Sequence, residues 1–122
     1  ALNDFNFSVN GLICVDVGAS TGGFTDCLLS RFAKKVYAVD LNDGLLHEKL
    51  KMDNRVVSII KNARDLNKSD FLEEIDFLVA DLSFISATYV LNVFSNILTS
   101  GKKAIILIKP QFETLLQKKL SD

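Results

Sequence analysis

Five short apolar runs recur along the chain, and each is followed by a polar residue or a glycine. Within a run the apolar residues are nearly continuous instead of alternating with polar ones. That pattern is typical of strands covered on both faces, as in a parallel sheet between two layers of helices. The predicted strands are residues 12–17, 36–40, 56–60, 77–81 and 103–109.

Stretches with helical spacing of apolar residues separate these runs. The first extends from Phe24 to Phe32, and Gly101 is predicted to stop the last one. Ser69 is the predicted cap of a short helix before the fourth strand. The predicted helical stretches are residues 24–32, 45–51, 69–72 and 90–98.

Strands and helices alternating in this order predict an α/β fold of the Rossmann-like type. Because crossovers between parallel strands are right-handed, the sheet is expected to be doubly wound and mostly parallel. The 122 residues suffice for a single domain, residues 1–122. The chain starts shortly before its first predicted strand and stops soon after its fifth, so we expect a partial domain.

Composition and charge narrow the function classes. The chain is 48% hydrophobic and 24% charged, as in an ordered globular protein, and its formal net charge is −1. This balance supplies no long-range attraction for nucleic acid or an anionic membrane. Any RNA-binding charge is therefore expected to be local, or to lie on another domain or chain.

Two cysteines and the absence of a targeting signal predict the compartment. Cys14 and Cys27 lack CxxC spacing and are predicted to be buried thiols in a reducing environment. The sequence shows neither a signal peptide nor an apolar run of about 20 residues, so we expect a soluble, cytoplasmic protein that makes no membrane contact.

A glycine-rich turn follows the first predicted strand, where ligands bind in open parallel sheets. A phosphate-binding P-loop needs a lysine after the glycines, and none follows Gly22 and Gly23. A dinucleotide motif has the spacing G-x-G-x-x-G, whereas the spacing from Gly18 is G-x-x-x-G-G. A turn that only closes a strand–helix unit stays open as an alternative.

The third ligand hypothesis is S-adenosylmethionine, which needs two acids at strand ends. Asp16 ends the first strand and would meet the methionine ammonium, and Asp40 ends the second and would accept the ribose hydroxyls. Proteins that bind NAD also use an acid on the ribose, so Asp40 does little to distinguish S-adenosylmethionine from a dinucleotide. Asp16 distinguishes the two ligands better, because it would repel the pyrophosphate of a dinucleotide.

Later strand ends suggest the methyl acceptor. Asp65 would accept the adenine amino group or be a solvated loop acid, and Asp81 lies near the expected methyl group or caps a helix. Lys109 ends the fifth strand. Together Asp81 and Lys109 would orient and deprotonate a ribose 2′-hydroxyl, and a plain salt bridge between them is the rival interpretation.

The motifs closely resemble those of one family. Residues 14–29, with the sequence CVDVGASTGGFTDCLL, resemble the cofactor motif of the TlyA, or haemolysin A, family of FtsJ-like RNA methyltransferases. Later blocks of that family are matched in order by residues 36–40, 46–50, 62–66, 81–86 and 108–113. The resemblance implies 2′-O-methylation of cytidine in ribosomal RNA, with S-adenosylmethionine as the donor.

The resemblance also implies roles for individual residues. Asp81 and Lys109 match the second and third members of the family's catalytic set Lys-Asp-Lys-Glu, and the first and last are not found in this chain. His47 is expected either near the cofactor or in a structural role. The implied cofactor-binding residues are Asp16, Gly18, Ala19, Ser20, Gly22, Gly23, Phe24, Asp40, Leu41, His47, Asp65 and Asp81.

Further expectations concern partners and completeness. The family's N-terminal S4 RNA-binding domain and the last strands of its sheet are missing from residues 1–122, so we expect these residues alone to be inactive. Ribosomal RNA or ribosomal subunits are the expected partners. No metal ion is expected. An open sheet edge favours pairing with a second copy of the chain, and so a homo-oligomer. The alternatives are a non-catalytic module that binds cofactor or RNA, and a small-molecule O-methyltransferase.

Overall fold

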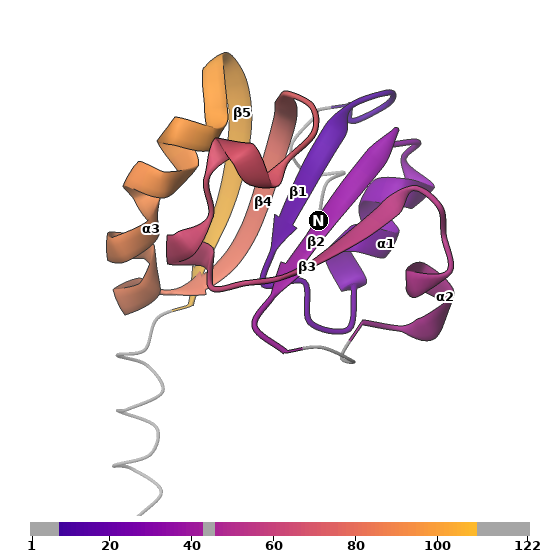
Figure 1. Ribbon diagram of the computed structural model, residues 1–122, viewed down its shortest axis with the longest axis horizontal. Coiled ribbons are helices and arrows are strands. Elements are labelled where there is room, and N and C mark those ends of the chain that lie inside the picture. Colours follow the sequence, from indigo (N-terminus) through magenta and orange to yellow (C-terminus); the bar gives the residue numbers. More distant parts are fainter. Residues whose placement is uncertain (1–7, 43–45, 110–122) are drawn as a thin grey trace, which may run out of the picture.

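The structure is one twisted parallel sheet with helices on both faces (Figure 1). The computed structural model describes residues 8–42 and 46–109, and only the backbone of residues 82–89, 99–100 and 108–109. The strands are β1 (Ile13–Val17), β2 (Lys35–Asp40), β3 (Val56–Ile60), β4 (Ile75–Ser83) and β5 (Leu98–Lys109). They lie in the order β3-β2-β1-β4-β5, and all four neighbouring pairs are parallel, which confirms the predicted doubly wound sheet.

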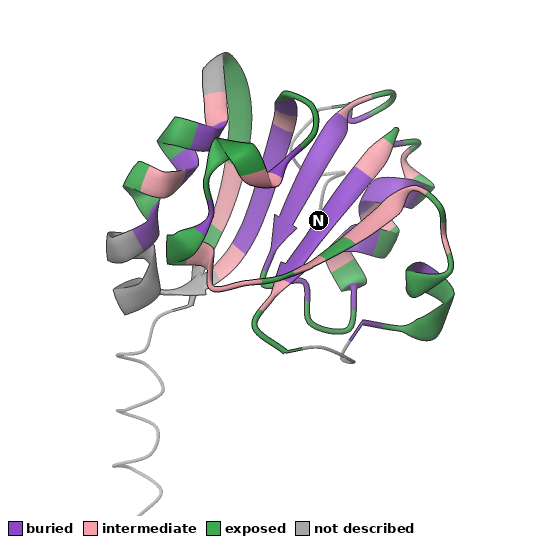
Figure 2. Ribbon diagram, viewed as in Figure 1, coloured by how far each residue is buried: buried purple, intermediate pink, exposed green. Residues whose placement is uncertain are grey.

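Helices α1 (Gly23–Ser30) and α2 (Glu48–Lys51) cover one face of the sheet, and α3 (Phe84–Ile97) covers the other. On the first face Leu28 of α1 packs with Cys14 and Val79, and on the second Phe94 of α3 packs with Leu78. All five residues of β1 are buried, and the central strands are buried along most of their length (Figure 2). Burial on both faces is the physical reason why the strands have continuous apolar sequences.

The short helix predicted over residues 69–72 is wrong. The chain instead forms two single 3₁₀ turns, Ala63–Asp65 and Lys68–Asp70. Asn67, not Ser69, is the cap: its side chain accepts from the Ser69 backbone N–H at 2.9 Å, and the Asp70 carboxylate accepts from the Asn67 N–H at 2.9 Å. This reciprocal pair of hydrogen bonds gives two backbone N–H groups of the turn a side-chain acceptor, and the chain is extended after the turn.

Two helix ends also differ from the prediction. Helix α1 stops at Ser30, and Phe32 adopts a left-handed conformation with 70% of its surface exposed, so it does not extend the apolar face. Helix α3 ends at Ile97 because Leu98 already pairs with Ile75 of β4. Gly101 does not stop the helix but lies inside β5, next to a shift in register between β4 and β5. Its φ of +87° is a conformation that glycine adopts readily and that such an irregularity requires.

A short helix precedes β3, as predicted, but its described part is only Glu48–Lys51. His47 is its cap: the Nδ1 atom accepts from the Lys49 backbone N–H at 3.2 Å. The predicted range 45–51 begins at a residue outside the described part of the chain.

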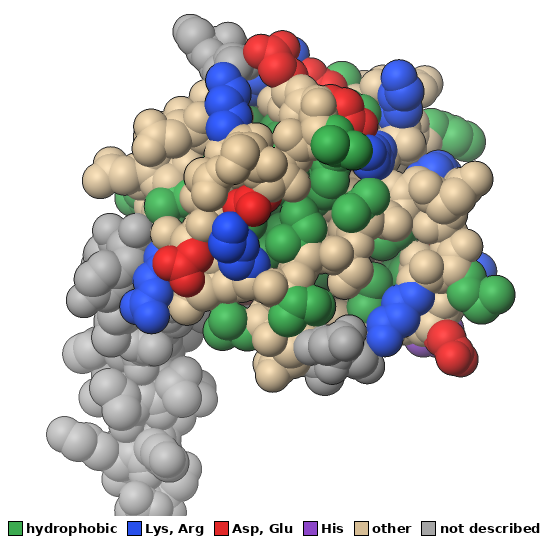
Figure 3. Space-filling view, in the orientation of Figure 1, with side chains coloured by type: hydrophobic (Ala, Val, Ile, Leu, Met, Phe, Trp, Pro, Cys, Tyr) green, Lys and Arg blue, Asp and Glu red, His purple; other side chains and the backbone are tan. Residues whose placement is uncertain are grey.

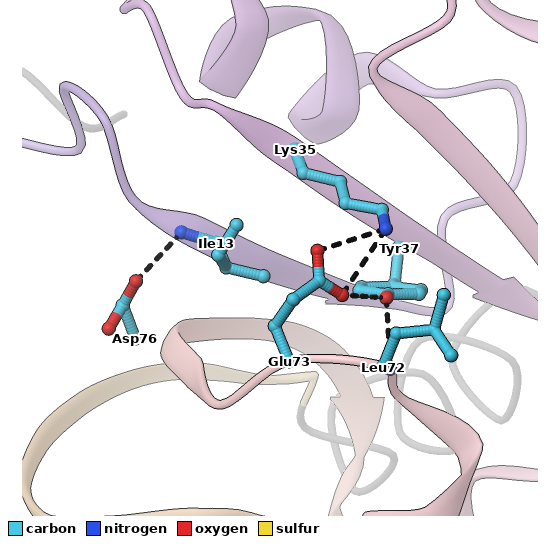
Figure 4. A network of polar contacts seen from close by, with 6 residues as sticks. All are labelled: Ile13, Lys35, Tyr37, Leu72, Glu73 and Asp76. Carbon is cyan, nitrogen blue, oxygen red and sulfur yellow. Dashed lines mark hydrogen bonds and ion pairs between the residues drawn. The ribbon is translucent and has the colours of Figure 1, made fainter.

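A polar network ties the sheet together at the amino-terminal ends of its strands (Figure 4). Glu73 accepts from Lys35 Nζ at 3.0 Å and from the Tyr37 hydroxyl, which itself accepts from the Leu72 backbone N–H. The Tyr37 hydroxyl, and secondarily Lys35, holds the pKa of Glu73 below its usual range. This network fixes the edge of the sheet opposite the strand ends that carry the candidate site.

Cys14 and Cys27 are both free thiols. Cys14 is fully buried, as predicted, and burial, with a smaller effect of Asp76, raises its pKa to about 12. Cys27 is only half-buried, at the side of α1 that packs on the core. A thiol with the pKa of Cys14 is protonated at neutral pH and behaves as a small apolar group.

Candidate functional site

A cleft of about 280 Å³ opens beyond the carboxyl ends of β1, β2 and β3. This is the edge where parallel sheets of this topology bind ligands. Its walls come from the ends of the strands, from the turn after β3 and from α3. The lining residues are Val17, Gly18, Val39, Asp40, Leu41, Asn42, Lys61, Asn62, Ala63, Arg64 and Val90.

Asp40 is the acid of the cleft, and two backbone groups hold its carboxylate. Oδ2 accepts from the Ser20 N–H at 2.8 Å, and Oδ1 accepts from the Asn42 N–H at 3.1 Å. The side chain is half-buried. Because each carboxylate oxygen has two lone pairs, each keeps one for a further donor. Asp40 is therefore oriented and able to accept from two hydroxyls at once.

The glycine turn is bound to the end of β2 through its backbone. The N–H groups of Gly18 and Ala19 both donate to the Val39 carbonyl, at 2.8 and 3.0 Å. Ala19 is buried in the core, while Gly18 and Ser20 are exposed. Gly18 has a φ of +77°, and a Cβ there would lie 3.3 Å from the Asp81 carbonyl oxygen. The turn therefore needs glycine at this position, beside the cleft.

Asp16 does not line the cleft. Its side chain is 1% exposed and lies under α1, where Oδ2 accepts from the Thr25 hydroxyl at 2.7 Å. Burial is the main reason that its pKa is raised to about 6; Thr25 opposes this rise, and Asp40 and Asp81 add to it. A direct contact with a ligand ammonium stays a prediction for Asp16. The hydrogen bond between Thr25 and Asp16 links α1 to β1.

Replacing Asp16 by Asn is expected to stabilise the fold at neutral pH by about 3 kcal/mol. The folded pKa of about 6 lies above the ordinary value of 3.8, so the folded state holds its proton more tightly than the unfolded state. Stability therefore falls as pH rises from 3.8 through about 6, and the full cost is present above that range. Urea unfolding at neutral and acidic pH measures it. A gain at neutral pH that vanishes near pH 3.8 is the expected result, and an equal change at both pH values would contradict the assignment.

Asp81 and Lys109 lie at the same ends of neighbouring strands, as predicted. Asp81 pairs with Leu107, and Lys109 pairs with Ser83, two residues further along β4. Asp81 is half-buried, and its backbone carbonyl lies next to Gly18. Only the backbone of Lys109 is described, so the contact between the two side chains stays a prediction.

Three other predicted residues surround a second cavity, of about 300 Å³. It is lined by Gly22, Gly23 and His47 together with Thr21, Asp26, Lys49 and Leu50. The His47 backbone N–H donates to the Thr21 carbonyl at 2.9 Å, which ties α2 to the glycine turn. Phe24 is half-buried and packs on the core. None of these residues lines the first cleft, so their cofactor roles stay predictions.

The turn after β3 contributes more than sequence analysis predicted. Asp65 is exposed and does not line the cleft, whereas Asn62, Ala63 and Arg64 do. A contact of Asp65 with the adenine amino group stays a prediction. Thr25 was missed as well, because its contact with Asp16 depends on how α1 packs.

The residues of the cleft fit the adenosine part of S-adenosylmethionine. Asp40 has two oriented oxygens for a vicinal diol, and the valines, alanine and leucine of the lining offer apolar surface to a flat base. Among the residues that the structure describes, no group of three or more His, Cys, Asp or Glu side chains is arranged to hold a metal ion.

A parallel sheet ordered β3-β2-β1-β4-β5, with a glycine turn after β1 and an acid at the end of β2, agrees with the class I methyltransferase fold. Solved S-adenosylmethionine-dependent methyltransferases that are only 17–20% identical have the same fold, with TM-scores of 0.71. A family model, the FtsJ-like methyltransferase, matches residues 1–121. The chain belongs to this family.

Individual relatives are more similar. Hemolysin A of Brachyspira hyodysenteriae is 51% identical over 115 residues, which cover 93% of this chain and 48% of that protein. The 16S/23S rRNA (cytidine-2′-O)-methyltransferase TlyA of Mycobacterium tuberculosis is 44% identical over 114 residues, covering 93% and 42%. A putative hemolysin structure from Streptococcus thermophilus is 45% identical with a TM-score of 0.86, covering 92% and 42%. The chain spans less than half the length of these relatives.

Proposed function

We propose that this chain is the cofactor-binding core of a methyltransferase that transfers a methyl group from S-adenosylmethionine to the ribose 2′-hydroxyl of cytidine in ribosomal RNA. The observation that carries the proposal is the Asp40 carboxylate, held by two backbone N–H groups at the mouth of an adenosine-sized cleft. The similarity to TlyA supports the substrate. The methyl transfer itself is proposed for the full-length protein to which this chain belongs.

In the proposed complex, Asp40 accepts the ribose hydroxyls of the cofactor. Leu41 and Ala63 pack against the base, and Gly18 lets the backbone come close to the ligand. When bound, S-adenosylmethionine supplies an electrophilic methyl group on a sulfonium. The chain's own contribution is to orient the ligand and to keep water out of the cleft.

The acceptor side of the proposal rests on Asp81 and Lys109. Asp81 lies at the end of β4, with its carbonyl next to Gly18, and Lys109 ends the neighbouring strand β5, where it pairs with Ser83, two residues beyond Asp81. In the proposed mechanism Lys109 takes the proton of the 2′-hydroxyl, and Asp81 orients the hydroxyl and stabilises the charged lysine. The S4 RNA-binding domain expected from the family resemblance would supply further RNA contacts.

The charge on one face of the molecule agrees with a need for additional RNA-binding elements. On the face shown in Figure 3, basic and acidic side chains are interspersed around a centre of hydrophobic side chains, without a block of one sign. In the described part of the chain, no helix has the length and hydropathy required to cross a bilayer. We propose that the protein acts in the cytoplasm on ribosomal subunits.

Replacing Asp40 by Asn is expected to weaken S-adenosylmethionine binding by about tenfold to a hundredfold. The amide keeps the shape of the carboxylate but loses the charge and one acceptor, and hydrogen bonds to a charged group contribute about 1.5–3 kcal/mol each. Isothermal titration calorimetry of the chain measures the affinity. In the full-length gene product, 2′-O-methylcytidine formed in ribosomal subunits, detected by mass spectrometry, tests the reaction.

Glu74→Gln is the matched control. It removes the same charge from an exposed side chain just before β4, at the opposite edge of the sheet. Its affinity should equal that of the parent. Absence of cofactor binding by the folded parent, or equal binding by Asp40→Asn, would overturn the cofactor assignment, and absence of 2′-O-methylcytidine would overturn the reaction.

A further inference from the structure

The turn after α1 carries a phenylalanine in a conformation that suits glycine. The backbone N–H groups of Phe32 and Ala33 donate to the carbonyls of Leu29 and Leu28, at 3.0 and 3.1 Å. This is the Schellman arrangement, in which glycine is the usual residue at the left-handed position. Phe32 occupies that position with a φ of +68°, where a residue with a Cβ strains the backbone. Phe32 therefore destabilises the turn relative to glycine.

Burial of the Phe32 ring does not compensate for this strain, because the residue is 70% exposed. The backbone around it is nevertheless anchored: the Gly11 N–H donates to the Phe32 carbonyl and the Lys34 N–H to the Leu12 carbonyl, both at 2.9 Å. A single exposed apolar side chain is common on protein surfaces. One that also strains a well-anchored backbone points to a role outside the fold.

Two cations without an acidic partner flank the ring. Within the described part of the chain, neither Arg31 nor Lys34 forms an ion pair, whereas Lys35 pairs with Glu73 at 3.0 Å. Arg31 is half-buried and Lys34 is exposed. Asp26, the acid of α1, lies in the first turn, at the other end of the helix. Residues 31–34, the aromatic turn, thus place a ring between two positive charges in a chain with a net charge of −1.

Two other strongly exposed apolar side chains lie in a different charge environment. Leu72, 90% exposed, precedes Glu73 and Glu74, and Met52, 83% exposed, precedes Asp53. Like the aromatic turn, both come shortly before a strand, at the edge of the sheet opposite the cleft. Acidic neighbours repel phosphate, so of these three positions only the aromatic turn has the charge to attract a polyanion.

We propose that the aromatic turn is an RNA contact site: an unpaired base stacks on the Phe32 ring, and Arg31 and Lys34 bind the neighbouring phosphates. The contact lies away from the cleft and goes beyond the proposed function, which contains no RNA contact at this edge. The choice of RNA over a protein partner rests on the two cations and on the RNA substrate of the proposed function. Because the contact needs neither cofactor nor methyl transfer, either proposal can fail without the other.

Two general properties of single-stranded RNA make it the fitting ligand. Each base has a flat π face that stacks on an aromatic ring whatever the identity of the base. Each phosphate can pair with a Lys or Arg, and salt weakens that pairing because counterions are released on binding. In a duplex the bases already stack on one another, so the ring finds no free face. Stacking at the aromatic turn should therefore require a single strand, tolerate changes of sequence and weaken with salt.

A fluorescein-labelled oligocytidylate is the probe, titrated with the 122-residue chain at low salt without cofactor and followed by fluorescence anisotropy. We expect Phe32→Ala to raise the Kd by about tenfold, because stacking is lost, and Phe32→Trp to bind at least as tightly as the parent. With the RNA annealed to its complement, Phe32→Ala should make no difference. Failure of the folded parent to bind the single strand, or equal Kd values for parent and Phe32→Ala, would overturn the inference and leave the cofactor assignment standing.

Phe32→Leu separates stacking from a contact with an apolar protein surface. Leucine is apolar but cannot stack, so its RNA affinity should fall as in Phe32→Ala; parental affinity would indicate an apolar docking surface and overturn the inference. Arg31→Gln and Lys34→Gln should each reduce the slope of log K against log salt by about 0.7, and unchanged slopes in both would equally overturn it. Leu72→Ala, the matched control at the same edge, should leave the Kd unchanged.

Phe32→Gly separates RNA binding from stability. Glycine adopts a φ near +68° without strain, so this variant should unfold at a higher urea concentration than the parent, while its Kd for the RNA rises by about tenfold. Opposite changes of stability and affinity would show that the ring serves binding at the expense of the fold. Parental RNA affinity in a more stable variant would overturn the inference. A fall in both stability and affinity would assign Phe32 a structural role and overturn it as well.

Discussion

Replacing Asp81 by Asn is expected to lower the rate of methyl transfer by about a hundredfold or more, while cofactor affinity changes by less than about tenfold. The amide has the size of the carboxylate, so packing at the end of β4 is kept. What is lost is the negative charge that orients the acceptor hydroxyl and stabilises the lysine once it takes a proton. General acid–base groups of this kind contribute about 10²–10⁴ in rate.

The position of Asp81 explains why rate and affinity should separate. Its carbonyl lies against Gly18, but it does not line the cleft that holds Asp40. Asp81 belongs instead to the β4–β5 side, where Ser83 pairs with Lys109. The proposed adenosine contacts and the proposed acceptor contacts thus come from opposite sides of β1.

Single-turnover methylation of ribosomal subunits by the full-length gene product measures the rate, and calorimetry on the same sample measures the affinity. Glu74→Gln, an exposed acid before the start of β4, should leave both unchanged. An Asp81→Asn protein that methylates at the parental rate would remove Asp81 from the mechanism. A loss confined to affinity would make it a binding residue.

Replacing Gly22 by Ala is expected to lower the free energy of unfolding by about 3 kcal/mol. Gly22 has a φ of +104°, a conformation that costs a residue with a Cβ about 1–2 kcal/mol. A Cβ there would also collide with Leu50 Cδ1 and lie 2.8 Å from Leu46 Cδ1. Both leucines are buried, so the contact adds an overpacking cost of about 1–3 kcal/mol.

Urea unfolding followed by circular dichroism measures this loss. Gly11→Ala is the matched control, because Gly11 has a φ of +74° but no atom within 4 Å of an added Cβ. It should show the backbone cost alone. Equal losses in the two variants would mean that Leu46 and Leu50 move away from the added Cβ without a measurable cost.

The elements were largely predictable because burial on both faces leaves a strong local signal. The five predicted strands are all present, since each central strand is a run of apolar residues between two helical layers. Helix ends were predicted less well. Phe32 continued the apolar spacing but is exposed, because a left-handed turn beginning after Arg31 takes it out of α1. Spacing alone carries no information about such a turn.

The sequence by itself determined that three acids, Asp16, Asp40 and Asp81, meet at one edge of the sheet, because the carboxyl ends of parallel strands share an edge. Only the tertiary structure decided which of them faces the cleft. Asp16 comes before the turn, where α1 covers the strand and supplies Thr25. Asp40 lies at the strand end itself, where the backbone of the two adjoining loops holds it open to a ligand. Which strand end a helix covers and which a loop leaves accessible depends on how the elements pack, and the spacing of residues along one strand does not record it.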